Sequence, residues 1–396
     1  MSDNVPAALG QAILGSVALG YAPVIDRQRN ILATRLTLAP LRAEAGLDHA
    51  ATLPALSAVW PKGGELLSPK SEALLAELLT HPPAEPVQIE VPAFVAADEA
   101  RTDALLALKA GGHTLVLAGL PNAPLAPAVA SAFKHVTLDP SQAAAAPAGV
   151  QVMHTGVQGT DAIEASFQAG AVAVIGWPMD GAYSAAPASG KTEIAADLQV
   201  IVELMSRVDQ GDDIERLEQT LKRDPSLAFK LLRYLNSAAF GLPVEVTSFR
   251  HAIMLLGYAR LKRWLALLLT TASKDHNMRP IMFGALRRGL LLEELAQSFE
   301  EREMRDEMFI CGLFSLLDHM LKQPFEKLLQ SIPMPERVRQ ALVDETGPYQ
   351  PYLELVRAIE AGSLFDIRER CDSLMLAAGE LNAAILRALY KASQIE

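Results

Sequence analysis

The hydrophobic pattern of the chain changes its period near residue 185, and this change constrains the fold more than any other feature. Before that point, short apolar runs alternate with alanine- and leucine-rich segments of helical period. After it, apolar residues recur every three or four positions, with no strand run of comparable strength. The first pattern predicts parallel βα units and the second predicts a bundle of helices. We therefore expect an α/β part followed by an all-α part.

The α/β part is predicted from seven strand-like runs and four helical segments. The strands are expected at 20–25, 31–38, 87–91, 114–120, 135–138, 150–154 and 172–177. The helices are expected at 71–80, 97–110, 125–133 and 160–168. A complete barrel of eight βα units usually needs about 250 residues. Because this part is shorter, we expect a trimmed or incomplete TIM-like barrel.

The boundary between the two parts is predicted from composition. Residues 180–191 are small, polar and contain proline and glycine, which is typical of a linker. We therefore expect an α/β domain at 1–183, a linker at 184–191 and an all-α domain at 192–396. Helices of the second domain are expected at 248–272, 281–300, 304–321, 335–345, 350–361, 363–376 and 378–392.

Charge and composition exclude several classes of function. The chain has 396 residues and a net charge of −11, which disfavours nucleic-acid and anionic-membrane partners. Apolar stretches end well before the roughly 18 residues that a membrane span needs. The two cysteines, Cys311 and Cys371, lie in helical sequence and are expected to be buried thiols. We expect a cytoplasmic protein without a cofactor.

One string in the all-α part carries a family resemblance. Residues 224–241 read DPSLAFKLLRYLNSAAFG, and TSFRHAIMLLG follows at 247–257. This sequence resembles the HDOD family, a bacterial helical signalling domain related to HD phosphohydrolases. The similarity runs from about residue 191 to the end of the chain, and it implies a helical bundle.

The metal ligands that HD hydrolases need are missing from the matching place. HD hydrolases hold divalent metal through a His-Asp pair and further His and Asp residues. The resemblance places that pair at 309–321, where Leu316 and Leu317 occupy the ligand positions. Asp318 and His319 are adjacent, and side chains of adjacent helical residues point about 100° apart. We expect a solvated helix edge here and no metal site.

The first part resembles the EAL domain, over roughly residues 19–183. The stretch YAPVIDRQRNILATRL at 21–36 is similar to the opening strand pair, and 157–177 is similar to the last βαβ stretch. Active EAL domains are barrels that hydrolyse cyclic di-GMP with divalent metals. The version found fused to HDOD domains is shortened and is the better match. The resemblance therefore implies a degenerate EAL-type barrel followed by an HDOD bundle.

The resemblance also implies that the catalytic ligands of the barrel are lost. The matching positions are Arg35, Ala118, Gly119, Thr137, Asp139, Thr155 and Gln158. The signature glutamate of the family falls on Arg35, which strand alternation places opposite Leu36, so a cation would lie where metals should bind. Asp139 is retained at a strand end, where a turn or cap is the usual role, and Glu90 is the other acid that we place on a strand. Since a two-metal site needs several oxygen ligands on each ion, we expect no catalytic and no metal-binding residues.

A stretch of the all-α part is a candidate partner surface. Its residues are Tyr258, Arg260, Arg263 and Trp264. Arg260 and Trp264 are four positions apart and share a helix face, as an exposed anchor would require. The alternative is that Trp264 lies in the core and Arg260 covers it. Basic residues at 260, 262, 263, 287 and 288 form either a solvated helix face or a surface for an anionic partner.

These observations favour a non-catalytic scaffold or regulator that acts through protein partners in a bacterial signalling pathway. One alternative is a receptor that binds cyclic di-GMP or another nucleotide without cleaving it, with Arg35 and Asp139 as contacts. A second is a residual phosphohydrolase. The surroundings of Arg35 discriminate between them. An open, polar barrel mouth around Arg35 would favour the receptor, and pairing with a nearby acid would favour the scaffold.

Overall fold

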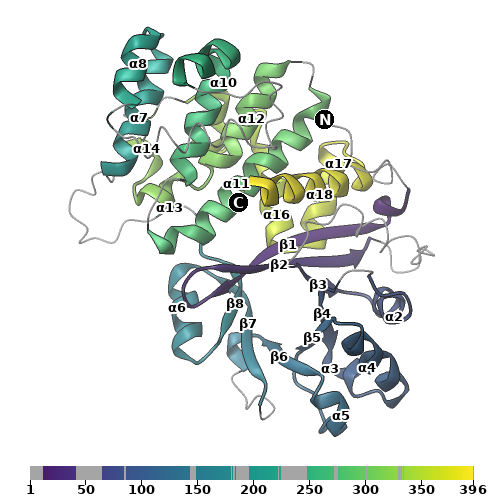
Figure 1. The fold of residues 1–396 in the computed structure, drawn as a ribbon. Helices are drawn as coiled ribbons and strands as arrows, with labels where there is room; N and C mark the ends of the chain where they lie inside the picture. The colour runs from purple at the N-terminus through teal and green to yellow at the C-terminus, as the bar shows by residue number, and fades with distance from the viewer. Residues whose placement is uncertain are drawn as a thin grey trace. The chain divides into compact units, whose positions relative to one another are not determined.

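The computed structural model divides the chain into two compact units (Figure 1). The barrel unit comprises residues 6–180 and 357–386, and the helical unit comprises 1–5, 181–356 and 387–396. The described residues are 12–41, 65–83, 86–142, 149–179, 181, 183, 196–221, 223, 248–271, 275–299, 301–328, 332 and 334–395.

Eight strands close the barrel in chain order, which confirms the α/β barrel expected from the sequence. The strands are β1 (Val17–Asp26), β2 (Ile31–Pro40), β3 (Glu65–Pro69), β4 (Gln88–Pro92), β5 (Thr114–Ala118), β6 (Phe133–Leu138), β7 (Gln151–Gln158) and β8 (Ala173–Trp177). Strand β1 runs antiparallel to both of its neighbours, β2 and β8, and the other neighbouring pairs are parallel. The sheet is therefore complete, and β3 is the strand that the pattern did not predict.

The trimming affects the helices around the sheet. Three of them have nine residues each: α2 (Glu72–Thr80), α4 (Thr102–Ala110) and α6 (Thr160–Gln168). Two others have a single turn, α3 (Ala93–Ala96) and α5 (Pro127–Ala130). Between β6 and β7 the described residues include just a short 3-10 turn, Pro140–Gln142. Short connections explain how a closed barrel fits into fewer residues than usual.

Side chains that point into the barrel pack against one another. They form one buried cluster drawn from β1, β2, β3, β5, β7 and β8: Val24, Ala33, Leu66, Val116, Met153, Ala173 and Ile175. Outward side chains of β1, β7 and β8 instead pack on Ile163 and Phe167 of α6. This alternation is the one that parallel barrel strands require, with one face in the interior and one under the helices.

The barrel unit also includes helical residues from the end of the chain. They are the end of α16 (Gln350–Ala361), all of α17 (Leu364–Ser373) and the start of α18 (Ala378–Ile395). Asn382 of α18 is buried and accepts a hydrogen bond from the Leu19 N–H (3.2 Å). Its amide also donates to the carbonyls of Leu14 and Val17, both at 2.6 Å. Residues 357–386, which the sequence places in the all-α domain, therefore pack with the barrel strands.

The helical unit is all-α among its described residues, as expected. Its helices are α7 (Ala196–Asp209), α8 (Ile214–Leu221), α10 (Phe249–Thr271), α11 (Arg279–Leu295), α12 (Arg302–Phe314), α13 (Leu317–Leu321), α14 (Phe325–Leu328) and α15 (Glu336–Leu342), with the start of α16 and the end of α18. Helices α11 and α12 approach closely, since a Cβ atom at Gly312 would lie 2.5 Å from the Arg288 carbonyl. The expected helix at 304–321 is interrupted at residues 315–316, between α12 and α13. The string at 224–241 lies outside the described residues.

Across the residues that the structure describes, no helix combines the length and apolar character needed to span a bilayer.

Candidate functional site

A small cavity lies at the carboxyl ends of the parallel strands, the end at which barrel enzymes build their active sites. Its volume is about 190 Å³. Residues of β1, β2, β7 and β8 line it, together with Lys70, which follows β3. Residues 359–362, which are the end of α16 and the glycine that follows it, complete the lining. We call this space the mouth cavity.

Arg35 of β2 lines the mouth cavity and is paired with an acid inside the barrel. Its Nη2 atom lies 2.7 Å from Oε2 of Glu90 on β4. The guanidinium also donates to the hydroxyls of Ser68 on β3 and Thr155 on β7, each at 3.1 Å. Four strands thus converge on one cation. From the sequence we considered two surroundings for Arg35, an open polar barrel mouth and pairing with a nearby acid. The structure has Arg35 paired with an acid, and the cavity beside Arg35 is small.

Glu90 is held between two cations. Its side chain is 2% exposed, and Oε2 accepts the Ser68 hydroxyl as well as the Arg35 guanidinium. The Lys70 ammonium lies 4.0 Å from the same oxygen. Burial, and then the neighbouring Arg35 charge, lower the Lys70 pKa from its ordinary value, while Glu90 acts in the opposite direction. The mouth therefore contains two basic side chains against one buried carboxylate.

This set of residues does not fit a metal centre of the EAL type. Among the described residues, no group of three or more His, Cys, Asp or Glu side chains is arranged to hold a metal ion. Each Mg²⁺ or Ca²⁺ ion needs several oxygen ligands, and Glu90 supplies its carboxylate to Arg35. A divalent ion would also be repelled by both Arg35 and Lys70.

Of the other positions implied by the EAL resemblance, two lie at the mouth cavity and Asp139 does not. Thr155 does bind Arg35, and Gln158 lines the mouth cavity. Asp139, however, is exposed after β6 and accepts hydrogen bonds from the N–H (2.9 Å) and hydroxyl (2.6 Å) of Ser141. These bonds lower the pKa of Asp139 and account for it as a turn residue.

The end of α16 and the turn that follows it cover the mouth cavity, which the sequence pattern did not predict. The indole N–H of Trp177, at the end of β8, donates to the Glu360 carbonyl at 3.2 Å. Gly20 of β1 lies beneath the turn, and a Cβ atom there would be 3.1 Å from the Ile359 carbonyl oxygen. The absence of a side chain at position 20 thus permits the close approach of the turn.

In the helical unit, the dipeptide Asp318–His319, which we call the Asp318–His319 step, binds Gly181 and Tyr183. Leu316 and Leu317 are buried apolar residues. The expectation that Asp318 lies on a solvated edge is wrong, because it is 2% exposed. Its Oδ2 accepts the Tyr183 N–H at 2.8 Å, and Nε2 of His319 lies 2.8 Å from the Gly181 carbonyl oxygen.

A family model described as the HDOD domain matches residues 194–331. These residues form an HDOD domain. The match includes α7, α8 and α10 to α14, and also the Asp318–His319 step. The match confirms the HDOD domain that we expected from the sequence. The closed sheet confirms the barrel that we expected to precede it in the chain.

Two curated relatives match part of the chain. The uncharacterized protein YuxH of Bacillus subtilis is 34% identical over 154 residues, which is 38% of this chain and 37% of the relative. The cyclic di-GMP phosphodiesterase CdgJ of Vibrio cholerae is 26% identical over 173 residues, 43% of this chain and 40% of the relative. The matched stretches thus span about two fifths of each relative.

Similar solved structures include proteins with EAL domains. The Klebsiella pneumoniae BlrP1 complex with calcium and cyclic di-GMP has a TM-score of 0.31 and 12% identity, covering 44% of this chain and 60% of that one. The Bacillus subtilis YkuI protein, with an EAL domain, calcium and cyclic di-GMP, has a TM-score of 0.30 and 9% identity, covering 61% and 73%.

The candidate partner surface of the HDOD domain is mostly occupied by internal contacts. Trp264 is 2% exposed, so the exposed anchor is corrected to a core residue. Arg263 lies 2.7 Å from Glu293 and 3.0 Å from Asp306, and its guanidinium stacks 4.1 Å from the Phe309 ring. The Tyr258 hydroxyl donates to the Asp212 carbonyl. Arg260 is partly exposed, and among the described residues the structure gives no ion pair, hydrogen bond or ring contact for its side chain.

The other basic residues of the two predicted clusters, Lys262, Arg287 and Arg288, are also buried or paired. Arg287 and Arg288 are buried, which overturns both the solvated-face and the anionic-surface readings for them. The Arg287 guanidinium lies 3.2 Å from the Phe283 ring centroid, and Arg288 donates to the Ser315 hydroxyl at 3.1 Å. Lys262 forms an ion pair with Asp209. Arg287 therefore packs on its own helix, and Arg288 connects α11 to the residue that follows α12.

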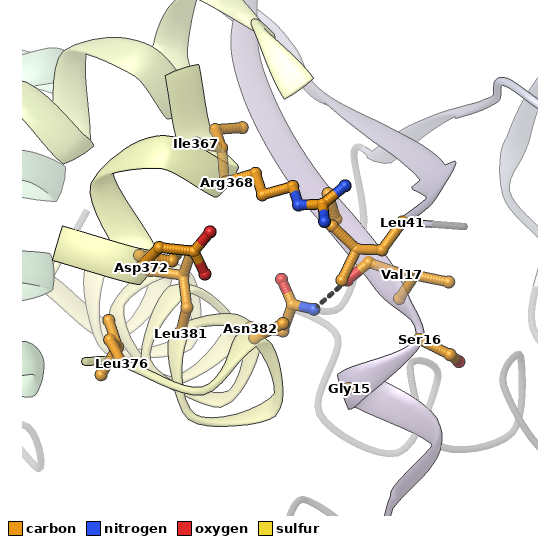
Figure 2. A pocket seen from close by; sticks show the side chains of 13 residues that line it. Gly15, Ser16, Val17, Leu41, Ile367, Arg368, Asp372, Leu376, Leu381 and Asn382 are labelled. Carbon is orange, nitrogen blue, oxygen red and sulfur yellow. Dashed lines mark hydrogen bonds between the residues drawn. The ribbon is translucent and has the colours of Figure 1, made fainter. Parts of the chain in front are cut away.

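A second cavity, of about 440 Å³, lies in the barrel unit between α17, α18 and the start of β1 (Figure 2). Arg368 and Asp372, one turn apart on α17, lie on one side, and Ser16 and Val17 lie on the other. Asn382 forms part of the wall, but its amide is engaged by the Val17 carbonyl. Cys371 also lines the cavity, and burial raises its pKa to about 11, so it is an unreactive thiol.

Proposed function

We propose that this protein is a non-catalytic scaffold or regulator in a bacterial cyclic di-GMP signalling pathway, acting in the cytoplasm through protein–protein interaction. The observation that carries the proposal is the ion pair of Arg35 with Glu90 in the barrel mouth. The pathway is suggested by the EAL-like sequence, the HDOD domain and the partial similarity to CdgJ.

The ion pair supports loss of catalysis because it uses the acid that a metal would need. Two-metal hydrolysis requires ions that activate water and neutralise the leaving phosphate oxygen. In this barrel a fixed guanidinium bonds to side chains of three other strands, and its partner Glu90 is almost completely buried. A cation that is part of the chain cannot activate water as a bound metal does. The fold is retained while the ligands are replaced, as expected when surface recognition is the function.

A non-hydrolysing nucleotide receptor is the second candidate. Its support is the presence of two basic side chains, Arg35 and Lys70, beside the mouth cavity. Two features oppose it. The cavity volume of about 190 Å³ is smaller than the roughly 300–1,000 Å³ usual for small-molecule sites. The Arg35 guanidinium, moreover, is already neutralised by Glu90.

The first prediction is an absence of turnover. Purified full-length protein with Mg²⁺ or Mn²⁺ should hydrolyse neither cyclic di-GMP nor nucleotide monoesters above background, measured by chromatography of the products. Titration calorimetry with cyclic di-GMP should show no heat of binding, while affinity capture from the native host should recover a protein partner. Turnover that disappears on Asp139→Asn or Glu90→Gln would establish the residual phosphohydrolase. Binding of cyclic di-GMP that Arg35→Met abolishes would establish the receptor.

A further inference from the structure

The HDOD domain holds residues 181 and 183 through three separate contacts. The Tyr183 backbone N–H donates to Oδ2 of Asp318 at 2.8 Å. The Gly181 carbonyl oxygen lies 2.8 Å from Nε2 of His319. The aromatic rings of Tyr183 and His319 meet edge to face, with centroids 5.9 Å apart and planes at 80°. Two contacts engage the main chain and one engages a side chain.

The chemistry of the two protein side chains is fixed by these contacts. A carbonyl oxygen can only accept, so His319 must carry its proton on Nε2 and donate it to Gly181. The Asp318 carboxylate is oriented by a second hydrogen bond, in which Oδ1 accepts the His319 N–H at 2.8 Å. Asp318 and His319 thus present one fixed acceptor and one fixed donor.

The bound groups are of the kind used in peptide recognition. Asp318 and His319 bind one main-chain N–H and one main-chain carbonyl, two residues apart in the sequence. Main-chain hydrogen bonds of this kind supply affinity in peptide recognition, and side-chain contacts supply specificity. Here the specificity comes from the aromatic ring at position 183 and from Gly181, whose φ of +76° favours glycine.

We propose that the Asp318–His319 step is a peptide-binding site for segments of the pattern Gly-x-Tyr, filled in this structure by the chain's own Gly181 and Tyr183. A partner protein that carries the same pattern would compete with this segment for the step. The contacts of Gly181 and Tyr183 do not depend on the proposed function, whereas competition by a partner rests on the proposed interaction function.

The test uses a fluorescent peptide that copies residues 179–186 (MDGAYSAA) and the full-length chain, with anisotropy as the readout. In wild-type protein the tethered segment has an effective concentration of about 1 mM and excludes the peptide. In Tyr183→Ala the tethered segment loses its anchor, so the peptide should bind at least about tenfold more tightly than to wild type. Adding His319→Ala to Tyr183→Ala should abolish binding. His319→Gln, which keeps an N–H donor, should retain part of it.

The controls separate recognition from folding. A peptide with alanine in place of the tyrosine should bind weakly or not at all to Tyr183→Ala, and this comparison requires no change to the domain. Failure of the tyrosine peptide to bind a folded Tyr183→Ala chain at about 1 mM would overturn the site, as would equal binding with and without His319→Ala. If host partners are still captured by a folded His319→Ala chain, the scaffold function stands and this site is not its basis.

Discussion

At the scale of single residues, Arg35 determines what the barrel mouth can do, and its contribution to stability can be measured. Arg35→Met keeps the apolar stem but leaves Glu90 buried without its guanidinium partner. Removal of one member of a buried ion pair typically costs about 3–5 kcal/mol. Lys70 is 4.0 Å from the same carboxylate and will offset part of this loss, so we expect about 2–3 kcal/mol.

Urea unfolding of Arg35→Met, Glu90→Gln and the double variant measures this coupling. Glu90→Gln retains an acceptor for the Ser68 hydroxyl, so the double variant should be more stable than Arg35→Met alone. Equal stabilities of wild type and Arg35→Met would show that the pair does not hold the mouth together.

Three histidines of the barrel unit predict how stability depends on pH. Burial lowers the pKa values of His113, His135 and His154 below the ordinary 6.5. The folded chain therefore keeps them neutral at a pH where the unfolded chain binds protons, so the free energy of unfolding should fall as the pH drops below about 6.5. The stabilising effect of the carboxylates with lowered pKa values is lost only at more acidic pH. His154→Gln should flatten the curve between pH 7 and 5, and the exposed His276→Gln should not. An unchanged slope in His154→Gln would contradict the assignment.

The sequence predicted residue roles where a local rule applied and failed where tertiary contacts decided. Strand alternation correctly placed Arg35 and Leu36 on opposite faces of β2, because the period of two is a property of the extended backbone. Helical spacing put Arg260 and Trp264 on one face, but it could not tell whether that face was covered. Asp318 was misjudged for the same reason, since its partner is the backbone of residue 183, far away in the sequence.

At the scale of helices and strands, Asn382 is the residue that attaches α18 to β1. Asn382→Leu is close in size but leaves the Leu19 N–H and the carbonyls of Leu14 and Val17 without this partner. Since an unsatisfied buried group costs about 1–3 kcal/mol, we expect a loss of at least about 2 kcal/mol. Hydrogen exchange at the start of β1 should accelerate in Asn382→Leu and stay unchanged in Gln394→Ala, a control on the exposed face of the same helix. Equal exchange in both variants would refute the attachment.

Most strands and helices were predictable because their hydrophobic period is local. Strand β3 was missed, since its five residues, ELLSP, include no β-branched or aromatic side chain and end in proline. Helix α6 was predicted with its observed ends, whereas the expected helix at 125–133 contracts to the four residues of α5. The covering of the barrel mouth by residues 359–362 left no trace in the sequence pattern, because it joins positions more than 180 residues apart.

At the scale of the whole molecule, the chain order and the compact units do not coincide, and this gives a prediction for proteolysis. Cleavage within the proposed linker at 184–191 would separate the barrel strands from a fragment that still contains residues 357–386. Because those residues belong to the barrel unit, the two fragments should co-elute on gel filtration after cleavage and separate in denaturant. Asn382→Leu should weaken the association. Fragments that separate under native conditions would contradict the observed packing.

The hydrogen bond between Leu19 and Asn382 has a consequence for the order of events during synthesis. Its two residues are 363 positions apart in the chain. A ribosome adding about 5–20 residues per second needs roughly 20–70 s to travel that distance. During this interval β1 has left the ribosome, but the amide that satisfies its first backbone groups has not been made. The HDOD domain, complete by residue 331, can fold in the meantime. The start of β1 is therefore completed by α18, the last helix of the described residues, and its first backbone groups lack this partner until α18 has been synthesised.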